Sequence, residues 1–364
     1  MRVNGRHHRS IWLADDGWSV EIIDQTRLPF EFVTVRLTTV EAAAEAIRTM
    51  RVRGAPLIGA TAAYGLCLAV HEDDSDEAIR AADATLRATR PTAVNLGWAL
   101  DQMAAALAQQ LNDRVQVAYA RAAQLCNNDV ASCQAIGLHG VEPIQAARAR
   151  KATEEPINIL THCNAGWLAT VDWGTALAPI YLAHDEGLPV HVWVDETRPR
   201  GQGALTAWEL GHHGVPYTLI VDNAGGHLMR TGMVDLCLTG ADRATANGDI
   251  CNKIGTYLKA LAARDNSVPF YAALPHSTID WTIAEGRDVP IEERDAEEVR
   301  MARGMAASGD VVEVRAVAED CPAHNPAFDV TPARLISGLI TERGVCAASA
   351  EGLHSLYPER ARND

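Results

Sequence analysis

The sequence predicts an α/β protein with a mainly helical N-terminal domain over residues 1–150 and a Rossmann-like parallel-sheet domain over residues 151–364. Before residue 150 the apolar residues recur three and four positions apart, which is typical of amphipathic helices. After Pro156 short β-branched runs alternate with helical segments, and this alternation favours a parallel sheet covered on both faces. The charged, proline-ended stretch RARKATEEP separates the two patterns.

Three stretches of the N-terminal domain carry helix signals. TTVEAAAEAIRTM opens with a threonine cap and a glutamate in the first turn. DDSDEAIRAADATLRATR and LGWALDQMAAALAQQL repeat the apolar spacing of a helix, and no strand is predicted from Thr39 to Arg150. The opening residues, MRVNGRHHRS, are basic and no apolar segment follows them, so we expect a short arm rather than a secretory signal.

The second domain shows a repeated order of strand and helix. Five short apolar runs predict strands: INILTH, VHVWVD, YTLIVD, VDLCLTG and PFYAAL. The segments predicted to be helical between them are WGTALAPIYLAHDEG, GALTAWELGHHG, a short glycine-containing stretch, and NKIGTYLKALAARD. This order specifies parallel strands joined by helical crossovers.

Composition excludes several classes of protein. The net charge of −15 disfavours nucleic acid as a partner, because nucleic-acid binding needs a basic surface. No apolar run approaches the roughly 18–20 residues of a membrane helix. The eight cysteines are scattered and form no CxxC pair, which argues against a zinc knuckle or a disulfide framework and predicts a reducing, cytoplasmic location.

A cysteine at the end of the first predicted strand is the leading candidate for chemistry. The run INIL delivers Thr161, His162, Cys163 and Asn164 to a turn of small residues, and ligands of parallel sheets bind at the carboxyl ends of the strands. Neighbouring side chains of a strand point to opposite faces, so His162 and Cys163 do not make a base and nucleophile pair. Cys163 is either a buried structural cysteine or an acid, base or hydrogen-bonding group with a partner from elsewhere.

A second candidate is a helix start that can bind an anion. Arg53, Gly54, Ala55 and Pro56 precede a long apolar stretch; proline suits the first helical position, and glycine lets a ligand approach the exposed amides. The alternative is an ordinary glycine turn before a core helix. Arg90, before a proline, offers a weaker version of the same feature or a solvated arginine at a helix break.

Two further candidates follow the fourth predicted strand. Asp242 stands at the end of that strand, where burial would raise the pKa of its carboxyl and suit it to general acid catalysis. It could instead pair with Arg243 or cap the next helix. Asn252 and Lys253 are predicted at the start of a helix, where they would offer donors and a positive charge to a phosphate.

Common cofactor and metal signatures are missing from the sequence. There is no GxGxxG after a strand and no Walker sequence, which argues against a nicotinamide dehydrogenase or a P-loop enzyme. The thirteen histidines lack the spacing of metal ligands. We therefore expect neither a metal nor an organic cofactor.

Seven stretches together resemble the methylthioribose-1-phosphate isomerase family, in the same order from about Gln25 to about Gly344. They are VRGAPLIGATAAYG, RPTAVNLGWAL, THCNAGWLAT with GTALAPI, VDETRPRGQGALTAWEL, TGADRATANGDICNKIGTY, STIDWTIAEGRDVPIEERD and NPAFDVTPARLISGLITERGV. This family is related to ribose-1,5-bisphosphate isomerase and to the regulatory subunits of the translation-initiation guanine-nucleotide exchange factor.

The resemblance implies a function and a set of residues. It implies an aldose–ketose isomerase of methionine salvage that acts on a small sugar phosphate as a homodimer. By resemblance Cys163 and Asp242 form the catalytic pair, and the contacts to the sugar phosphate come from Arg53, Gly54, Ala55, Arg90, Gln202, Asn252 and Lys253. Two alternatives stay open: an isomerase of another 5-substituted ribose 1-phosphate, such as 5-deoxyribose 1-phosphate, and a non-catalytic regulatory subunit.

The substrate class poses a chemical problem, because a sugar phosphorylated on its anomeric oxygen does not open spontaneously. We expect protonated Asp242 to donate to the ring oxygen and hydrogen then to move from C2 to C1. Cys163 would act as the base of an enolate route or would stabilise the transition state of a hydride shift. Whether Trp167 and Trp173, close to Cys163 in the sequence, enter the site is not decided by the sequence.

Overall fold

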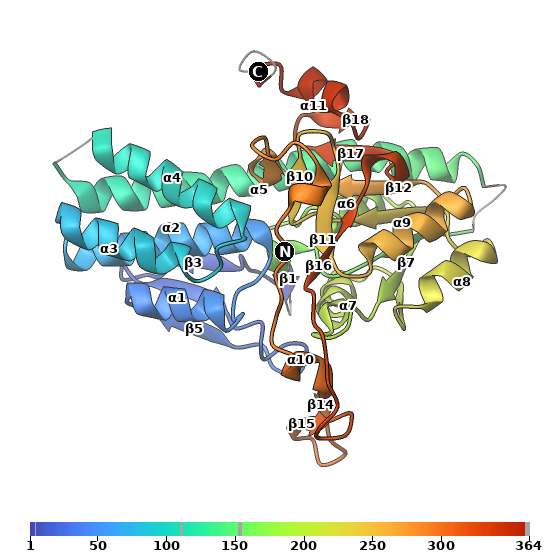
Figure 1. Ribbon diagram of the computed structural model, residues 1–364, viewed down its shortest axis with the longest axis horizontal. Coiled ribbons are helices and arrows are strands. Elements are labelled where there is room, and N and C mark those ends of the chain that lie inside the picture. The colour runs from blue at the N-terminus through green and yellow to red at the C-terminus, as the bar shows by residue number, and fades with distance from the viewer. Residues whose placement is uncertain (4, 110–111, 152–154, 361–364) are drawn as a thin grey trace.

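The computed structural model describes residues 1–3, 5–109, 112–151 and 155–360. Helices α1–α4 lie at one end of the molecule and a large sheet with its covering helices at the other, with α5 running between them (Figure 1). This arrangement confirms the predicted α/β class, with a mainly helical part followed by a Rossmann-like parallel sheet. The domain boundary at residue 150 stays a prediction.

The helical part is built around one buried helix. Its five helices are α1 (Val40–Arg48), α2 (Ala55–Glu72), α3 (Asp76–Arg87), α4 (Val94–Gln109) and α5 (Arg114–Arg148). Helix α2 is apolar all round, from Leu57 to Val70, and a helix of this kind is stable only when neighbours cover it on all sides. The predicted absence of strands from Thr39 to Arg150 is confirmed for the described residues.

Helix α5 belongs to two hydrophobic cores. Ala122 and Leu125, in its first half, pack in the core of the helical part. Ile136 and Ile144, in its second half, pack against the large sheet and α6 (Leu177–Asp185). Because one continuous helix is buried in both cores, the two parts of the molecule are held in a fixed relation.

The opening residues are folded, so the prediction of a short arm was wrong. They form a hairpin of β1 (Arg2–Val3) and β2 (Arg6–His7), followed by an antiparallel sheet of β3 (Ile11–Leu13), β4 (Val20–Ile23) and β5 (Thr34–Leu37). His7 Nε2 lies 2.7 Å from Asp172 Oδ2, and the Ser10 amide donates to the Val171 carbonyl at 2.9 Å. These contacts join segments about 160 residues apart, which explains why local sequence did not reveal them.

The large sheet has seven strands in the order β18-β17-β12-β9-β6-β7-β8. All neighbours are parallel except β17 and β18. The strands are β6 (Ile157–Thr161), β7 (Val190–Asp195), β8 (Tyr217–Ile220), β9 (Leu236–Thr239), β12 (Phe270–Ala273), β17 (Gly338–Thr341) and β18 (Gly344–Cys346). The five predicted strands are confirmed as β6, β7, β8, β9 and β12, whereas β17 and β18 were not predicted.

Both faces of this sheet are covered. Besides α5 and α6, the helices of this part are α7 (Gln202–His213), α8 (Ala224–Arg230), α9 (Thr256–Asp265) and α11 (Ala350–Leu356). Adjacent residues of β6 take part in different cores: Ile159 packs with α5 and α6, and Leu160 packs with Met229 and Phe270. This alternation is the expected pattern of a strand buried on both faces.

A smaller sheet corrects another prediction. It has the order β13-β10-β11-β16, with β10 (Arg243–Thr245), β11 (Ile250–Lys253), β13 (Ile279–Asp280) and β16 (Phe328–Thr331). Asn252 and Lys253 end strand β11, so they do not begin a helix as predicted; α9 starts at Thr256, after Gly255 with φ of 103°. Pairing of β11 with the distant β16 holds Asn252 and Lys253 in extended backbone.

The remaining elements lie at the periphery or in connections. Helix α10 (Glu297–Arg300) leads into a hairpin of β14 (Met301–Met305) and β15 (Val311–Arg315) that projects from the body of the molecule (Figure 1). The described residues also form short 3₁₀ helices: η1 (Trp167–Ala169), η2 (His276–Thr278), η3 (Gly286–Asp288) and η4 (Ala333–Leu335).

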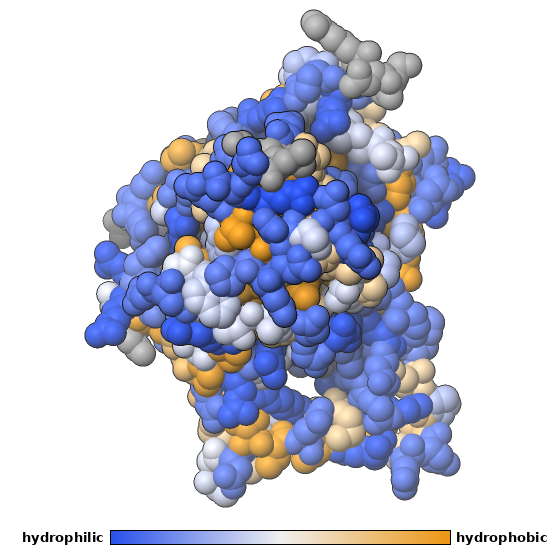
Figure 2. All heavy atoms as spheres, turned by 90° about the vertical axis from the view of Figure 1, so that its left-hand side faces the viewer, coloured by the Kyte–Doolittle hydropathy of each residue, from blue (hydrophilic) through white to orange (hydrophobic). Residues whose placement is uncertain are grey.

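Figure 2 shows that the end of the molecule formed by the helical part is largely hydrophilic, with apolar side chains only in small groups. Within the described ranges, no helix combines the length and apolar character needed to cross a membrane.

Contact between α5 and α6 gives a test of the packing. A Cβ added at Gly140 of α5 would lie 2.3 Å from Pro179 Cγ of α6. We expect Gly140→Ala to lower the free energy of unfolding by about 1–3 kcal/mol, since overpacking must push the two helices apart. Gly226→Ala on α8 is the control, because its Cβ would meet Ala262 at an ordinary 3.5 Å. Gly226→Ala should raise the free energy of unfolding by about 0.5–1 kcal/mol. If denaturant unfolding shows Gly140→Ala to be the more stable variant, the packing described here is contradicted.

Candidate active site

One pocket lies where the helical part meets the carboxyl ends of the parallel strands. Its atom-free space is about 660 Å³, a figure that includes space open to solvent. All nine residues predicted for the site line it: Arg53, Gly54, Ala55, Arg90, Cys163, Gln202, Asp242, Asn252 and Lys253. They come from six separate segments of the chain, which only the tertiary fold brings together.

Cys163 and Asp242 face the pocket from neighbouring strands. Cys163 follows β6, and Asp242 follows β9, which pairs with β6. The chain passes from β6 to β7 in one direction across the sheet and from β9 to β12 in the other. The gap between β6 and β9 is therefore the topological switch point, where open α/β sheets form a crevice for ligands.

Cys163 is held in an uncommon backbone conformation. Its φ is 68°, in the left-handed region that residues with a side chain rarely adopt, and Thr197 beside it has φ of 59°. The Cys163 amide donates to Thr197 Oγ1 at 2.9 Å, and the Thr206 hydroxyl donates to the Cys163 carbonyl at 2.8 Å. Burial raises the pKa of the Cys163 thiol, although the charges of Arg53 and Lys253 oppose the increase.

Asp242 is neither paired with its neighbour nor placed at a helix start. The Arg243 guanidinium instead reaches Asp280 Oδ2 at 3.0 Å and the Thr92 carbonyl at 2.6 Å, and the segment that follows is strand β10. Burial raises the pKa of the Asp242 carboxyl above its usual value, against the opposing charges of Lys253, Arg90 and Arg53. These surroundings suit a carboxyl that keeps its proton closer to neutral pH.

The start of α2 lies at the pocket, where Gly54, Ala55 and Pro56 are among the lining residues. Gly54 precedes the helix with φ of 95°, and a proline follows in the first turn. A Cβ added at Gly54 would lie 2.4 Å from the Cα of Ala169, so only glycine allows this close approach of the two parts. The dipole of α2 favours an anion bound at this end of the helix.

Three cations surround the pocket. Arg53 donates from both terminal nitrogens to Asn164, to Oδ1 and to the carbonyl, each at 2.5 Å. Arg90 pairs with Glu292 at 2.6 Å. Lys253 is buried with its ammonium 4.6 Å from the centre of the Phe328 ring, and burial lowers its pKa.

Gln202 contributes an unused acceptor. It is the first residue of α7 and is buried at the pocket wall. Its Oε1 atom has no hydrogen-bond partner among the described residues. Buried polar atoms normally have partners, so a hydroxyl of a bound ligand is a suitable donor to this oxygen.

A buried carboxylate organises the loop that carries Cys163 and Asn164. Glu209 of α7 is only 1% exposed, and burial raises the pKa of its carboxyl. Its two oxygens accept four hydrogen bonds of 2.8–3.1 Å, from Asn164 Nδ2, the Trp167 and Leu168 amides, and the Tyr181 hydroxyl. The turn after β6 is thereby tied to α7 at three points.

Sequence reasoning missed four residues that act on the pocket: Asn164 as a partner of Arg53, Glu209, Glu292 and Phe328. A signal existed for Glu209, which lies four residues after Leu205 on the buried face of a predicted helix. Glu292 and Phe328 are brought to the pocket by long connections and had no local signal.

The two tryptophans near Cys163 are not among the residues that line the pocket. Trp167 is 1% exposed in the core between the sheet and α6, and Trp173 packs against the same core. They support the loop from behind and do not offer a surface to a ligand in this pocket.

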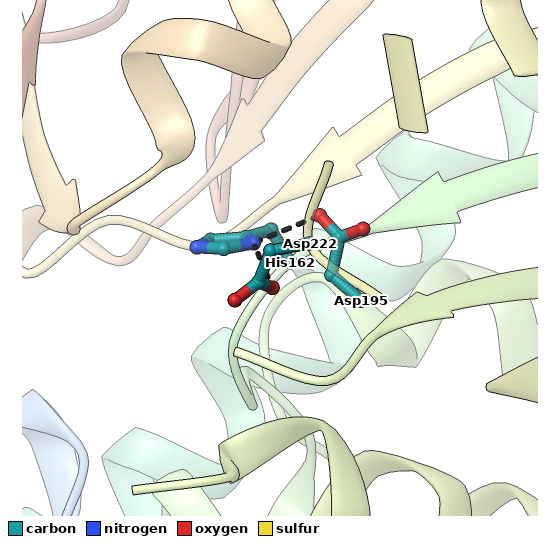
Figure 3. A group of neighbouring side chains, drawn as sticks. All are labelled: His162, Asp195 and Asp222. Carbon is teal, nitrogen blue, oxygen red and sulfur yellow. Dashed lines mark hydrogen bonds and ion pairs between the residues drawn. The ribbon is translucent and has the colours of Figure 1, made fainter. Parts of the chain in front are cut away.

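Beneath Cys163 lies a group of three side chains whose atoms are close enough to share a metal ion: His162, Asp195 and Asp222 (Figure 3). Several of their ligand atoms have partners, although Asp195 Oδ1 is buried without a hydrogen-bond partner among the described residues. His162 Nδ1 lies 2.9 Å from Asp195 Oδ2, and the Lys259 ammonium lies 3.1 Å from the same oxygen. The lysine supplies a positive charge beside this buried carboxylate.

Comparisons with known proteins agree on one group of relatives. A model of the initiation factor 2 subunit family matches residues 51–348. Methylthioribose-1-phosphate isomerase of Methylorubrum extorquens is 62% identical over 100% of both chains. The Rhodospirillum rubrum protein of the same name is 63% identical, covering 99% of this chain and 94% of the relative.

Two solved structures are also similar over nearly the whole chain. The 5-methylthioribose 1-phosphate isomerase of Pyrococcus horikoshii is 39% identical, with 97% of each chain covered and a TM-score of 0.83. A structure from A. fulgidus described as translation initiation factor eIF-2B, subunit delta, is 36% identical. It covers 97% of this chain and 100% of its own, with a TM-score of 0.79.

The four hydrogen bonds of Glu209 can be tested by an isosteric change. In Glu209→Gln an NH2 group replaces one of the two oxygens. This group cannot accept the two hydrogen bonds that the oxygen accepted, so we expect a loss of about 1–3 kcal/mol in the free energy of unfolding. Tyr181→Phe removes one donor and leaves the carboxylate three, so its loss should be smaller, about 0.5–1.5 kcal/mol. Equal losses for both variants in denaturant unfolding would show that the carboxylate is not the centre of this network.

Proposed function

The chain belongs to the methylthioribose-1-phosphate isomerase family, and from this premise we propose that it converts 5-methylthioribose 1-phosphate into 5-methylthioribulose 1-phosphate. It is an aldose–ketose isomerase. The observation that carries the assignment of residues is the pocket at the switch point, where a thiol and a carboxyl from adjacent strands meet three cations.

The phosphate would bind at the start of α2. Exposed amides of that helix, with Arg53, Arg90 and Lys253 nearby, offer a positive site inside a protein of net charge −15. Asn252 and Gln202 would bind sugar hydroxyls or phosphate oxygens, and the unpartnered Oε1 of Gln202 supports such a contact. Binding the non-reacting phosphate at several points fixes C1 and C2 relative to the catalytic groups.

Asp242 would act as the general acid. In its protonated form it donates to the ring oxygen as the bond between that oxygen and C1 breaks, which opens a ring that the phosphate otherwise keeps closed. The raised pKa of Asp242 supports this role, because the protonated form then persists closer to neutral pH.

Cys163 would assist the transfer of hydrogen from C2 to C1. In an enolate route it removes the proton from C2, and the proton returns to C1 as the ketone forms at C2. In a hydride route the hydrogen moves directly with its electron pair, the C2 hydroxyl loses its proton, and Cys163 stabilises the transition state. Either way hydrogen moves within one substrate, so no external electron acceptor is required.

Other assignments follow the family resemblance. We propose that the reaction belongs to methionine salvage, that the enzyme works in the cytoplasm and that it forms a homodimer. The eight cysteines, none of them in a disulfide among the described residues, are consistent with a reducing compartment.

Two alternatives are separated by direct assays. A preference for 5-deoxyribose 1-phosphate would appear as the larger kcat/KM when the two sugars are compared. A regulatory role has a specific reason to be tested, since the similar A. fulgidus structure is described as an initiation-factor subunit. That role predicts no turnover of any sugar phosphate and a stable macromolecular partner.

Replacing the catalytic pair tests the mechanism. We expect Asp242→Asn and Cys163→Ala each to lower kcat by about 10²–10⁴-fold, the usual contribution of a general acid or base. The assay measures turnover of 5-methylthioribose 1-phosphate. Far-UV circular dichroism of each variant verifies that it is folded. Cys251→Ala is the matched control, since this buried cysteine lies outside the lining of the pocket. Wild-type turnover in either pocket variant would remove that residue from the mechanism.

The pH dependence of kcat/KM tests the protonation of Asp242. Only the protonated carboxyl donates, so activity should be present below its pKa in the free enzyme and should fall as pH rises through that value. Because burial raises this pKa, the fall should lie above the usual range of an aspartate. The residual activity of Asp242→Asn should lack this alkaline limb; a limb unchanged in that variant would assign it to another group.

A further inference from the structure

Directly before Cys163 stands a buried histidine that the proposed chemistry does not use. His162 is 1% exposed, and both of its ring nitrogens have protein partners. Nε2 lies 2.8 Å from the carbonyl of Ile254, and Nδ1 lies 2.9 Å from Asp195 Oδ2. Both partner atoms are oxygens that can accept a hydrogen bond from the ring.

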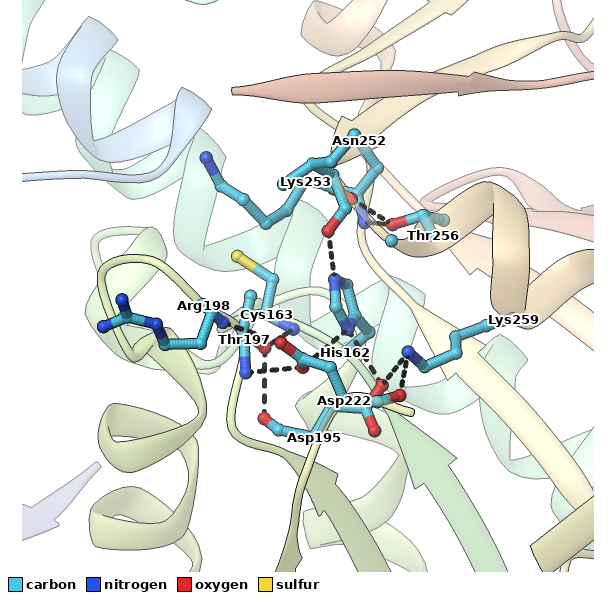
Figure 4. Close-up of polar contacts among 12 residues, drawn as sticks. His162, Cys163, Asp195, Thr197, Arg198, Asp222, Asn252, Lys253, Thr256 and Lys259 are labelled. Atoms are coloured by element: carbon cyan, nitrogen blue, oxygen red, sulfur yellow. Dashed lines mark hydrogen bonds and ion pairs between the residues drawn. The ribbon is translucent and has the colours of Figure 1, made fainter. Parts of the chain in front are cut away.

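The Nε2 contact joins two segments of the pocket. His162 is adjacent to Cys163, and Ile254 directly follows Lys253, so one side chain links the end of β6 to the end of β11. Figure 4 shows His162 next to Cys163, with a dashed line from its ring to the segment that carries Asn252 and Lys253. The backbone packs closely on the ring: a Cβ added at Gly255 would lie 3.0 Å from His162 Cε1.

The ring is also held from its other side. Asp195 at the end of β7 contacts Nδ1, and Lys259 of α9 pairs with the same carboxylate at 3.1 Å. Asp222 accepts hydrogen bonds from the Thr197 and Arg198 amides at 2.8 and 2.9 Å. Thr197 in turn accepts from the Cys163 amide, so the aspartates hold both His162 and the strained backbone of Cys163.

We propose that His162 is a positioning residue that sets the separation of Cys163 and Lys253 through its Nε2 bond to the Ile254 carbonyl. The effect on turnover rests on the proposed function, but the effect on pocket geometry does not. Phosphate held by Lys253 and the reacting carbon near Cys163 belong to one small substrate. A change in the separation of these segments would therefore weaken phosphate binding and misalign the thiol together.

Two amide substitutions separate this role from simple support of the fold. In His162→Gln the side-chain amide nitrogen can take the place of Nε2 and keep the bond to Ile254, but the contact with Asp195 is lost. In His162→Asn the nitrogen can take the place of Nδ1 and keep Asp195, but the bond to Ile254 is lost. If His162 is a positioning residue, His162→Gln should retain most of its activity and His162→Asn little. If His162 only supports the buried Asp195, His162→Asn should be the more active of the two variants.

The first measurement is kcat/KM per folded enzyme for 5-methylthioribose 1-phosphate. We expect His162→Asn to lose about 100-fold, as misplacement by about 1 Å can cost, and His162→Gln to stay within about tenfold of the wild type. The proposal would be overturned by equal losses of kcat/KM in the two variants, by no loss in His162→Asn, or by a greater loss in His162→Gln. His213→Asn is the matched control, because His213 contacts Asp185 at 2.9 Å on the outer end of α7; it should behave as wild type.

The second measurement needs no turnover. Inorganic phosphate bound in the pocket should slow the alkylation of Cys163 by iodoacetamide. Mass spectrometry of the peptide that contains Cys163 measures the extent of alkylation over time. The phosphate concentration for half-protection should rise about tenfold or more in His162→Asn and little in His162→Gln. If the wild type turns over no sugar phosphate, the proposed function fails while this ranking still tests His162, and equal values in both variants overturn the positioning role.

A further variant covers the case in which both amide variants fail to fold. Gly255→Ala would place its Cβ against the ring and push Nε2 away from the Ile254 carbonyl. Positioning predicts weaker protection of Cys163 by phosphate in this variant as well. Protection equal to that of the wild type would contradict the proposal.

Discussion

A chain of buried hydrogen bonds from Arg53 through Asn164 to Glu209 is the constraint on which the pocket depends. Arg53 belongs to the helical part, Asn164 to the turn after β6, and Glu209 to α7, so the chain joins the parts that face each other across the pocket. Each member would be costly to bury alone, and each is stabilised by the next. Arg53 and Asn164 both line the pocket, and Glu209 supports Asn164 from outside that lining.

The same arrangement controls the chemistry of the site. Burial favours the neutral forms of Asp242 and Cys163, and the neighbouring cations oppose this effect without reversing it. An acid and a thiol can therefore stand beside the positive charges that a phosphate requires. The strained backbone at Cys163 and Thr197 is stable because hydrogen bonds from several elements hold it, an arrangement common where a side chain must be aimed at a ligand.

Patterns within single segments predicted much of the fold. The five strands β6, β7, β8, β9 and β12 were correct because a strand buried on both faces appears as a short β-branched run. The sequence did not predict the strands of the opening sheet, and it predicted a helix start where β11 ends. These strands are short and are stabilised by distant segments, as β11 is by β16. Asn252 and Lys253 line the pocket, but the sequence predicted the wrong backbone for them.

The sequence by itself determined the α/β class, because buried periodicity is a local property of the chain, and its resemblance to a known family pointed to the nine residues that meet in the pocket. Only the tertiary structure decided how those residues are held: Asn164 on Arg53, Glu209 beneath the turn, and His162 between Cys163 and the carbonyl of Ile254. Such partners lie 45 to 111 residues apart, and their contacts follow from the order of the strands and the packing of α5 and α7. Distances across a fold are set by packing, and no segment of the sequence carries them alone.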